Sequence, residues 1–204
     1  MSLVIKSAQY VVSSPDVAHC PSDGLAEYAF IGRSNVGKSS LINMLTQNQK
    51  LAQTSATPGK TRMINHFLIN KSWFLVDLPG YGFARRSQDK VQGFSRMIRE
   101  YLLMRQEMVL LFLLIDSRLE PQKIDLDFVR FLGENGVPFC LVFTKADKSS
   151  HSRVMSHVHM FLDALKEEWE ELPQYFVTSS ETGEGRDQVL DYIHSVNQSL
   201  KEES

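Results

Sequence analysis

A glycine-rich loop that ends in lysine and serine carries the clearest chemical signal in the sequence. Residues 32–39 read GRSNVGKS, which matches the pattern G-x-x-x-x-G-K-[S/T]. In such a loop the glycines let backbone N–H groups surround phosphate oxygens, the lysine adds positive charge and the serine offers a hydroxyl to Mg²⁺. These roles fall here to Gly32 and Gly37, to Lys38 and to Ser39. The loop therefore predicts a magnesium-dependent site for nucleotide phosphates.

The segments on either side of this loop fit the same prediction. Tyr28–Ile31 is a short apolar run typical of a buried strand, and the segment from Ser40 places Leu41, Ile42 and Leu45 on one helical face. The loop would then lie between a strand and the N-terminus of a helix, whose dipole favours anions.

A second motif, Asp77-Leu78-Pro79-Gly80, follows an apolar run. An aspartate at the end of a strand can hold Mg²⁺ through water, and the N–H of Gly80 can donate to a terminal phosphate. This segment is therefore predicted to sense whether that phosphate is present.

Thr144-Lys145-Ala146-Asp147 predicts which base is bound. Asp147 can accept hydrogen bonds from N1–H and the exocyclic amine of guanine, whereas adenine presents an acceptor at N1. The stem of Lys145 can cover the base, and the hydroxyl of Thr144 can brace neighbouring loops. Thr178-Ser179-Ser180 could contact the guanine carbonyl, although a serine-rich helix cap is an alternative interpretation.

The elements that must position these motifs alternate along the chain. Strands are expected at 28–31, 64–69, 72–76, 108–115, 139–143 and 175–177, and helices at 40–45, 91–103, 124–132, 153–169 and 187–200. This alternation predicts an α/β fold with a doubly wound, mostly parallel sheet. The hairpin of strands 64–69 and 72–76, turned at Asn70-Lys71, would add one antiparallel edge strand. We expect a single domain over residues 1–204, with residues 1–24 as an N-terminal extension and the first twenty or so as a tail.

Composition excludes several other classes of protein. The chain has 204 residues, 43% of them hydrophobic, and a net charge of −2, so any basic surface must be local. Its two cysteines, Cys20 and Cys140, do not indicate a disulfide framework, and His157 and His159 do not form a metal motif. The longest apolar run is too short to span a bilayer, and the N-terminus lacks a signal-peptide pattern. We expect a cytoplasmic protein that does not bind membranes.

These four motifs, together with the loop Thr57-Pro58-Gly59-Lys60-Thr61, resemble the five motifs of translation-factor-type P-loop GTPases. More narrowly, TPGKTR, DLPGYGFA and TKADK resemble the EngB family of bacterial GTP-binding proteins, also called YihA or YsxC, over nearly the whole chain. The resemblance implies a small-GTPase fold, GTP hydrolysis and a role in assembly of the large ribosomal subunit. It also implies links to cell division and septation.

Residues 46–63 form a long polar loop, which we interpret as switch I, and residues 77–90 as switch II. Two threonines in switch I could bind magnesium. Thr57 precedes Pro58 and is biased toward extended backbone, whereas Thr61 lies just before a strand. We choose Thr61, and the family pattern agrees with this choice. Closure of the loop on GTP and its release after hydrolysis would be the switch.

The expected site residues follow from these motifs. Those expected to act in catalysis are Lys38, Thr61 and Gly80, and those expected to hold Mg²⁺ are Ser39, Thr61 and Asp77. The nucleotide is expected to contact Gly32, Arg33, Ser34, Asn35, Val36, Gly37, Lys38, Ser39, Ser40, Gly59, Lys60, Thr61, Arg62, Met63, Asp77, Leu78, Pro79, Gly80, Thr144, Lys145, Asp147, Thr178, Ser179 and Ser180.

Intrinsic hydrolysis is expected to be slow. Many GTPases place a glutamine directly after D-x-x-G to orient water, but Tyr81 stands there, and a hydroxyl cannot reproduce the donor and acceptor of an amide. Activation would come from a partner or from a bound monovalent cation such as K⁺. Asn35 favours the cation, because potassium-using bacterial GTPases carry an asparagine at this position, although asparagine also suits ordinary turns.

A basic stripe is predicted around the second switch. It consists of Arg85, Arg86, Lys90, Arg96, Arg99 and Arg105, and it could bind ribosomal RNA or simply be a solvated helix face. We expect a monomer that binds GTP and GDP and acts on the large subunit or its precursor. Alternatives are a septation or scaffold factor that senses GTP without depending on hydrolysis and, less in keeping with the guanine motif, a kinase.

Overall fold

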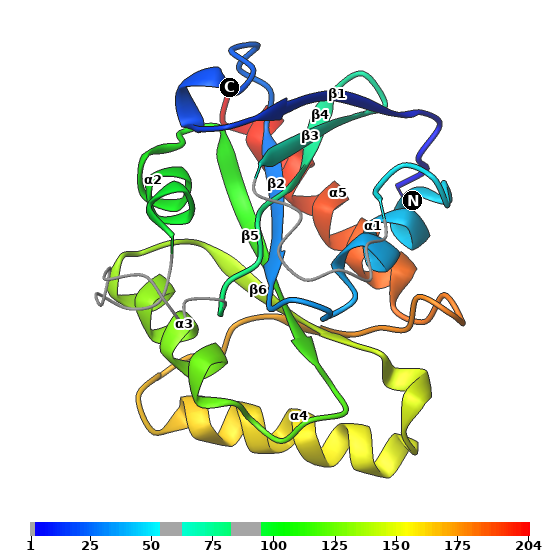
Figure 1. Cartoon of the computed structure of the whole chain (residues 1–204), viewed down its shortest axis with the longest axis vertical. Helices are drawn as coiled ribbons and strands as arrows, with labels where there is room; N and C mark the ends of the chain where they lie inside the picture. The colour runs from blue at the N-terminus through cyan, green and yellow to red at the C-terminus, as the bar shows by residue number, and fades with distance from the viewer. Residues whose placement is uncertain (1–2, 54–62, 83–94) are drawn as a thin grey trace.

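A computed structural model describes residues 3–53, 63–82 and 95–204, and Figure 1 shows their arrangement. In chain order the elements are β1 (Ala8–Ser14), the 3₁₀ turn η1 (Val17–His19), β2 (Glu27–Gly32), α1 (Lys38–Thr46), β3 (Ile64–Ile69), β4 (Trp73–Asp77), α2 (Arg96–Met104), β5 (Met108–Asp116), α3 (Lys123–Glu134), β6 (Phe139–Thr144), the 3₁₀ turn η2 (Ala146–Lys148), α4 (His151–Lys166), β7 (Tyr175–Val177) and α5 (Arg186–Glu202).

The described strands form one sheet in the order β1-β3-β4-β2-β5-β6-β7. Neighbouring strands from β4 to β7 pair in parallel, and β3 pairs antiparallel with both β4 and β1. The predicted α/β fold with a mostly parallel sheet is therefore confirmed. Because parallel strands end at the same edge, their carboxyl ends are brought together.

The predicted hairpin is present, but its position in the sheet differs from the prediction. Asn70 and Lys71 both have positive φ, 51° and 56°, as the two central residues of a type I′ turn require. However, β3 is not the edge strand, because β1 pairs along its outer side from Ala8↔Ile69 to Ser14↔Ile64. The N-terminal tail is thus corrected to an edge strand. Its alternation of apolar residues is interrupted by the bulge between Tyr10 and Val12, which hides the strand signal.

Helices cover both faces of the sheet (Figure 1). Along β2, Ala29 and Ile31 pack in the cluster that contains α2, α3 and α4, whereas Tyr28 and Phe30 pack in the cluster that contains α1 and α5. This division explains why β2, β5 and β6 read as unbroken apolar runs, since both faces of each strand are buried. None of the helices in the described ranges is long and apolar enough to cross a membrane.

The two cysteines and the two tryptophans of the chain lie in or against this core. Cys20 and Cys140 are buried free thiols, and burial raises the pKa of Cys140 to about 12. Trp73 is buried edge-on against Tyr28. α4 ends at Lys166 rather than at Trp169, whose ring lies past the helix and packs edge-on against Phe139.

A buried polar network consolidates the end of the sheet away from the carboxyl edge. Glu27, at the start of β2, accepts hydrogen bonds from Tyr101 (2.6 Å) and Arg105 (2.6 Å) and lies 2.8 Å from Nε2 of His66. Arg105 also donates to the carbonyl of Pro21 (2.5 Å). Burial opposes ionisation of Glu27, but the bonds to His66, Arg105 and Tyr101 prevail and lower its pKa. The network therefore ties α2 and β3 to β2.

We predict that Arg105→Ala lowers the free energy of unfolding by about 3–5 kcal/mol, because it leaves the buried Glu27 carboxylate without its cation. The lowered pKa of Glu27 adds stability above its ordinary value of 4.5, and that stability is lost as pH falls through the folded-state pKa. The difference between wild type and variant should therefore shrink toward acidic pH. Urea unfolding at about pH 7 and about pH 4 measures this difference in the free energy of unfolding.

Arg130→Ala, which removes an exposed pair with Glu168, is the control and should lower the free energy of unfolding by less than about 1 kcal/mol. Equal losses in the two variants would contradict the prediction.

Candidate nucleotide site

The motifs predicted from the sequence meet at the carboxyl edge of the sheet. β2 ends at Gly32, β4 at Asp77, β6 at Thr144 and β7 at Val177. Each predicted motif begins at the end of its strand or with the residue that follows. The parallel pairing thus brings the phosphate loop, D-L-P-G, T-K-A-D and T-S-S to one edge.

The phosphate loop closes onto the N-terminus of α1. Gly37 has φ 98°, a left-handed conformation that side chains disfavour, and α1 starts with the next residue, Lys38. Ser39 and Ser40 follow in the first turn, whose backbone N–H groups are not used by the helix itself. The loop therefore presents amide donors, an ammonium group and hydroxyls together, which suits a phosphate chain.

The D-L-P-G segment lies against this loop. Leu78 N donates to the carbonyl of Phe30 (3.0 Å) and Tyr81 N to that of Gly32 (3.3 Å). A Cβ on Gly80 would stand 3.0 Å from the carbonyl oxygen of Gly32, so glycine allows this close approach. Lys38 bridges the two segments, since its Nζ donates to the carbonyl of Leu78 and forms an ion pair with Asp77.

The T-K-A-D segment braces the phosphate loop from the other side. The hydroxyl of Thr144 donates to the carbonyl of Val36 at 2.6 Å, and Nζ of Lys145 donates to that of Asn35 at 2.6 Å. Lys145 itself is left-handed, with φ 61°. The bracing expected of Thr144 is thus present in the structure.

Asp147 is oriented by the T-S-S segment. Ser179 is fully buried, and its hydroxyl donates to Oδ1 of Asp147 at 2.7 Å. That hydrogen bond lowers the pKa of Asp147, which favours the ionised form that accepts hydrogen bonds from a base. Thr178 holds the T-S-S segment in place. Its N–H and its hydroxyl both donate to the carbonyl of Phe143, at 2.7 and 3.0 Å, and its carbonyl accepts from Ala146 N at 3.0 Å.

Tyr81 lies in the core rather than facing the phosphate loop. It is 2% exposed, its ring stacks on Phe128 at 4.4 Å, and its hydroxyl donates to Asp125 of α3 at 2.5 Å. Burial raises the pKa of Tyr81 well above its ordinary value, and it also raises that of Asp125. Tyr81 therefore anchors the end of D-L-P-G to α3, which is a packing role that sequence reasoning did not identify.

Asp116, at the end of β5, was also missed. Its carboxylate accepts three hydrogen bonds from the Arg118 side chain, the shortest at 2.8 Å, and lies 3.4 Å from Nζ of Lys145. Burial opposes its ionisation, but the bonds from Arg118 and the charge of Lys145 prevail and lower its pKa. Its position matches that of Asp77 at the end of β4, which is the signal that could have found it. A depression of about 210 Å³ opens beside it, lined by residues 33–36 and by residues of the β5–α3 connection.

Several predicted residues lie outside the described part of the chain. In switch I these are Thr57, Gly59, Lys60, Thr61 and Arg62, whereas Met63 is described and is 40% exposed. In the basic stripe they are Arg85, Arg86 and Lys90.

Within the described half of the basic stripe, the prediction is wrong for Arg105. Arg105 is buried on Glu27, Arg99 lies over the ring of Phe131 at 5.3 Å, and Arg96 pairs with Glu100 at 2.6 Å. Arg105 is not a surface cation, because its guanidinium binds the buried Glu27. The sequence did not reveal Glu27 as its partner, because the two residues lie far apart along the chain.

Comparison with known proteins identifies the family. A model of a family described as 50S ribosome-binding GTPases matches residues 27–145. A protein from Phocaeicola vulgatus named probable GTP-binding protein EngB is 61% identical over 97% of this chain and 98% of its own length. The chain belongs to the EngB family. A Porphyromonas gingivalis member is 57% identical over 96% of this chain and 98% of its own length.

Solved structures agree with this assignment. The crystal structure of a probable GTP-binding protein EngB matches with a TM-score of 0.59 and 26% identity over 85% of this chain and all of its own. An archaeal elongation factor, SelB from Methanococcus maripaludis, shares the fold with a TM-score of 0.59 at 16% identity, covering 83% of this chain and 32% of that one. This EngB chain is a P-loop GTPase that binds GTP and GDP and hydrolyses GTP.

We predict that Asp147→Ala lowers the affinity for GDP by about 100-fold or more, because two hydrogen bonds to a charged acceptor are lost. Affinity for ATP should change little. Titration with fluorescent GDP, GTP and ATP in magnesium buffer measures this. Ser179→Ala removes the hydroxyl that donates to Asp147 and accepts from Thr182 N (3.2 Å) but keeps the Asp147 carboxylate. It is the matched variant, and its affinity for GDP should fall by about tenfold. Indifference of GDP binding to Asp147→Ala would show that the base is read elsewhere.

Proposed function

We propose that this GTPase is a nucleotide-dependent switch that acts in assembly of the large ribosomal subunit. The observation that carries the proposal is the convergence of a phosphate loop, D-L-P-G and T-K-A-D at one edge, in a chain that matches a family of 50S ribosome-binding GTPases. D-L-P-G can sense the terminal phosphate, while T-K-A-D selects the base. Nucleotide state could then control the surface offered to a ribosomal partner. The protein would act as a cytoplasmic monomer.

The proposed cofactor is Mg²⁺, and the residues present suit it. Asp77 is buried at the end of β4, where its Oδ1 contacts the ammonium group of Lys38 as an ion pair. Ser39 lies one residue after Lys38 in the first turn of α1. A carboxylate and a hydroxyl are hard oxygen donors of the kind that magnesium prefers. Asp77 and Ser39, with Thr61 of switch I, would hold the ion, which neutralises phosphate charge when bound.

The proposal predicts that binding to purified large ribosomal subunits depends on the nucleotide. The protein with a non-hydrolysable GTP analogue should bind at least about fivefold more tightly than with GDP, which is the usual lower range of coupling between two sites. Co-sedimentation at fixed salt measures it. Asp147→Ala is the control and should bind equally in the two conditions, because it stays largely without nucleotide at the lowest nucleotide concentrations that saturate the wild type. Equal binding of wild type with GDP and with the analogue would contradict a switch acting on this subunit.

We further propose that intrinsic hydrolysis is slow and that K⁺ accelerates it. The burial of Tyr81 in the core supports the first part, because this side chain lies against Asp125 and Phe128 rather than over the phosphate loop. Asn35 supports the second part. It is exposed and left-handed, and its carbonyl is taken by Lys145, while its side-chain amide has no hydrogen bond from the described residues.

Turnover in KCl should therefore exceed turnover in NaCl of equal ionic strength by about tenfold, since a cation at the phosphates stabilises developing charge. Asn35→Ala should remove most of this difference while GDP affinity stays within about twofold. Steady-state phosphate release measures both. Equal wild-type rates in the two salts would exclude the cation and leave a protein or RNA partner as the activator.

A further inference from the structure

The small net charge conceals an uneven distribution of charge along the chain. Residues 1–76 contain seven Lys or Arg and three Asp or Glu, which gives a net charge of +4. Residues 77–204 contain 15 Lys or Arg and 21 Asp or Glu, which gives a net charge of −6. The two values together give the −2 of the whole chain. No Asp or Glu occurs anywhere from Tyr28 to Val76. A basic surface is therefore expected where exposed parts of this segment meet.

Two turns of this acid-poor segment, the β3–β4 turn and the loop after α1, meet the N-terminal segment at one corner of the molecule. The side chain of Asn70, in the β3–β4 turn, accepts hydrogen bonds from the backbone of Lys6 (2.7 Å) and Ser7 (3.2 Å) and donates to the carbonyl of Val4 (2.8 Å). The N-terminal segment is thus fixed beside this turn. It faces the loop that follows α1 across a depression of about 450 Å³, lined by residues 5–8 and 46–50.

The loop after α1 is held as firmly as the N-terminal segment. The buried side chain of Asn43 accepts from Ala52 N (2.7 Å) and donates to the carbonyls of Gln49 (3.1 Å) and Ala52 (3.0 Å). At the start of α5, Arg186 donates to the last carbonyls of α1, those of Met44 and Leu45. Both walls of the depression are therefore anchored by hydrogen bonds.

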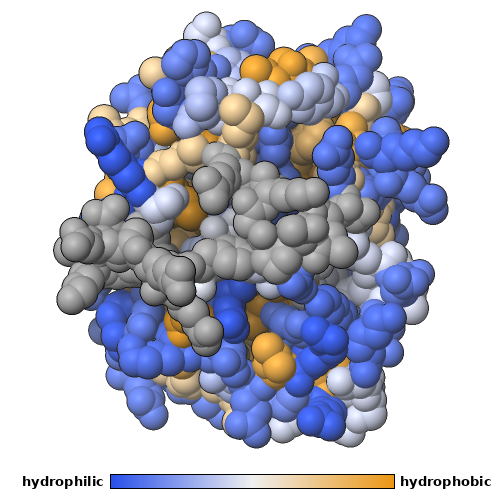
Figure 2. All heavy atoms as spheres, viewed as in Figure 1, coloured by the Kyte–Doolittle hydropathy of each residue, from blue (hydrophilic) through white to orange (hydrophobic). Residues whose placement is uncertain are grey.

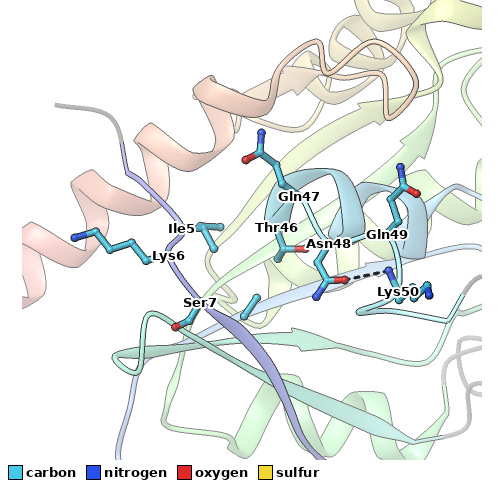
Figure 3. A pocket seen from close by; sticks show the side chains of 9 residues that line it. Ile5, Lys6, Ser7, Thr46, Gln47, Asn48, Gln49 and Lys50 are labelled. Atoms are coloured by element: carbon cyan, nitrogen blue, oxygen red, sulfur yellow. Dashed lines mark hydrogen bonds between the residues drawn. The ribbon is translucent and has the colours of Figure 1, made fainter.

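Lysines and amides dominate the rim. Figure 3 shows Lys6 and Lys50 on opposite sides of the depression, with the Lys6 side chain directed outward, Asn48 beside Lys50, and Gln47 and Gln49 extending outward. Lys71 lies in the neighbouring β3–β4 turn, and all three lysines are exposed. Within the described chain no carboxylate lies within 4.0 Å of Lys6, Lys50 or Lys71, whereas Lys123, Lys148 and Lys166 each have an acidic partner. We name Lys6, Lys50 and Lys71 the basic corner.

We propose that the basic corner binds the sugar–phosphate backbone of structured RNA, with a phosphate–ribose segment entering the depression between Lys6 and Lys50. Unpaired ammonium groups attract phosphates, and the neighbouring amides can both donate to and accept from ribose hydroxyls and base edges. Figure 2 shows that hydrophilic side chains prevail on the right of the view, where Figure 1 places the N-terminus and the loop after α1.

RNA fits this surface better than a membrane does. A flat lipid surface could reach the lysines but could not fill a depression whose floor lies between two anchored segments, whereas an RNA backbone can enter it. Amide side chains also add little to lipid binding but suit the polar edges of RNA. The proposal rests on the proposed ribosomal function for its biological partner, but the affinity of the corner for RNA can be measured without it.

The test compares two triple variants of equal charge. K6Q/K50Q/K71Q removes the basic corner, and K123Q/K166Q/K201Q removes three exposed lysines elsewhere. Binding to purified large-subunit ribosomal RNA is measured over a range of salt concentrations. The corner variant should bind at least about tenfold more weakly near 0.1 M salt, and its salt slope should fall by about 2, as expected for three lost phosphate contacts. The control should match wild type.

Thermal unfolding of each variant checks for a folding defect. The double variant K6Q/K71Q leaves residues 46–63 unchanged, so its weaker RNA binding could not come from a disturbed predicted switch I.

The outcomes separate this inference from the proposed function. RNA binding that is equal in the two triple variants, or absent in wild type, overturns the basic corner. Loss of binding to phosphatidylglycerol vesicles without loss of RNA binding assigns the corner to anionic lipid and overturns it as well. The proposed function is decided by the nucleotide dependence of wild-type binding to intact large subunits, so either idea can fail while the other stands.

Discussion

Two main-chain carbonyls in the phosphate loop are the points on which the site depends. The carbonyl of Asn35 accepts from Lys145, and that of Val36 accepts from Thr144, both at 2.6 Å. These bonds fix the distance between the loop that would hold phosphate and the loop that would read the base. Because Ser179 in turn orients Asp147, three segments far apart in sequence share one hydrogen-bonded framework. A base reader so constrained loses little conformational freedom on binding, which favours affinity.

The opposite side of the phosphate loop is built differently. Gly80 approaches the carbonyl of Gly32 so closely that a side chain would crowd it, and the next residue, Tyr81, enters the core and bonds to Asp125 on α3. One end of D-L-P-G is thus set by strand β4 and the other by a buried tyrosine. Tyr81 therefore has a structural role at a position where many GTPases place a catalytic glutamine. Replacing Tyr81 by glutamine would consequently also remove its packing against α3.

The sequence predicts most of the fold because its signals are local. Apolar runs bounded by polar turns predicted β2 to β7, and the Asn70-Lys71 turn predicted the hairpin. It did not predict β1, because the bulge at Tyr10–Val12 breaks the alternation of that strand and its pairing partner, β3, is about fifty residues away. Motif spacing predicted that the nucleotide loops meet, but not the roles of Asp116, Asp125 and Arg105. Each of these makes its decisive contact with a residue on another element, and no local pattern encodes such a contact.

The two ends of the sheet differ in their electrostatics, because one can attract an anionic ligand and the other stabilises a buried carboxylate of the protein itself. At the carboxyl edge, backbone amides, the N-terminus of α1 and Lys38 provide positive potential around the phosphate loop, where Asp77 pairs with Lys38, and this arrangement suits an anionic ligand. At the other end, the burial of Glu27 requires Arg105, Tyr101 and His66 to surround one carboxylate. Tyr101 lies in α2 and Arg105 is its C-cap, and α2 is the first helix after the predicted switch II. The C-terminal end of α2 is therefore anchored to β2. A conformational change that starts at D-L-P-G must therefore end before Tyr101. Moving Tyr101 would break its hydrogen bond to the buried Glu27 carboxylate, and the loss of that bond would be costly.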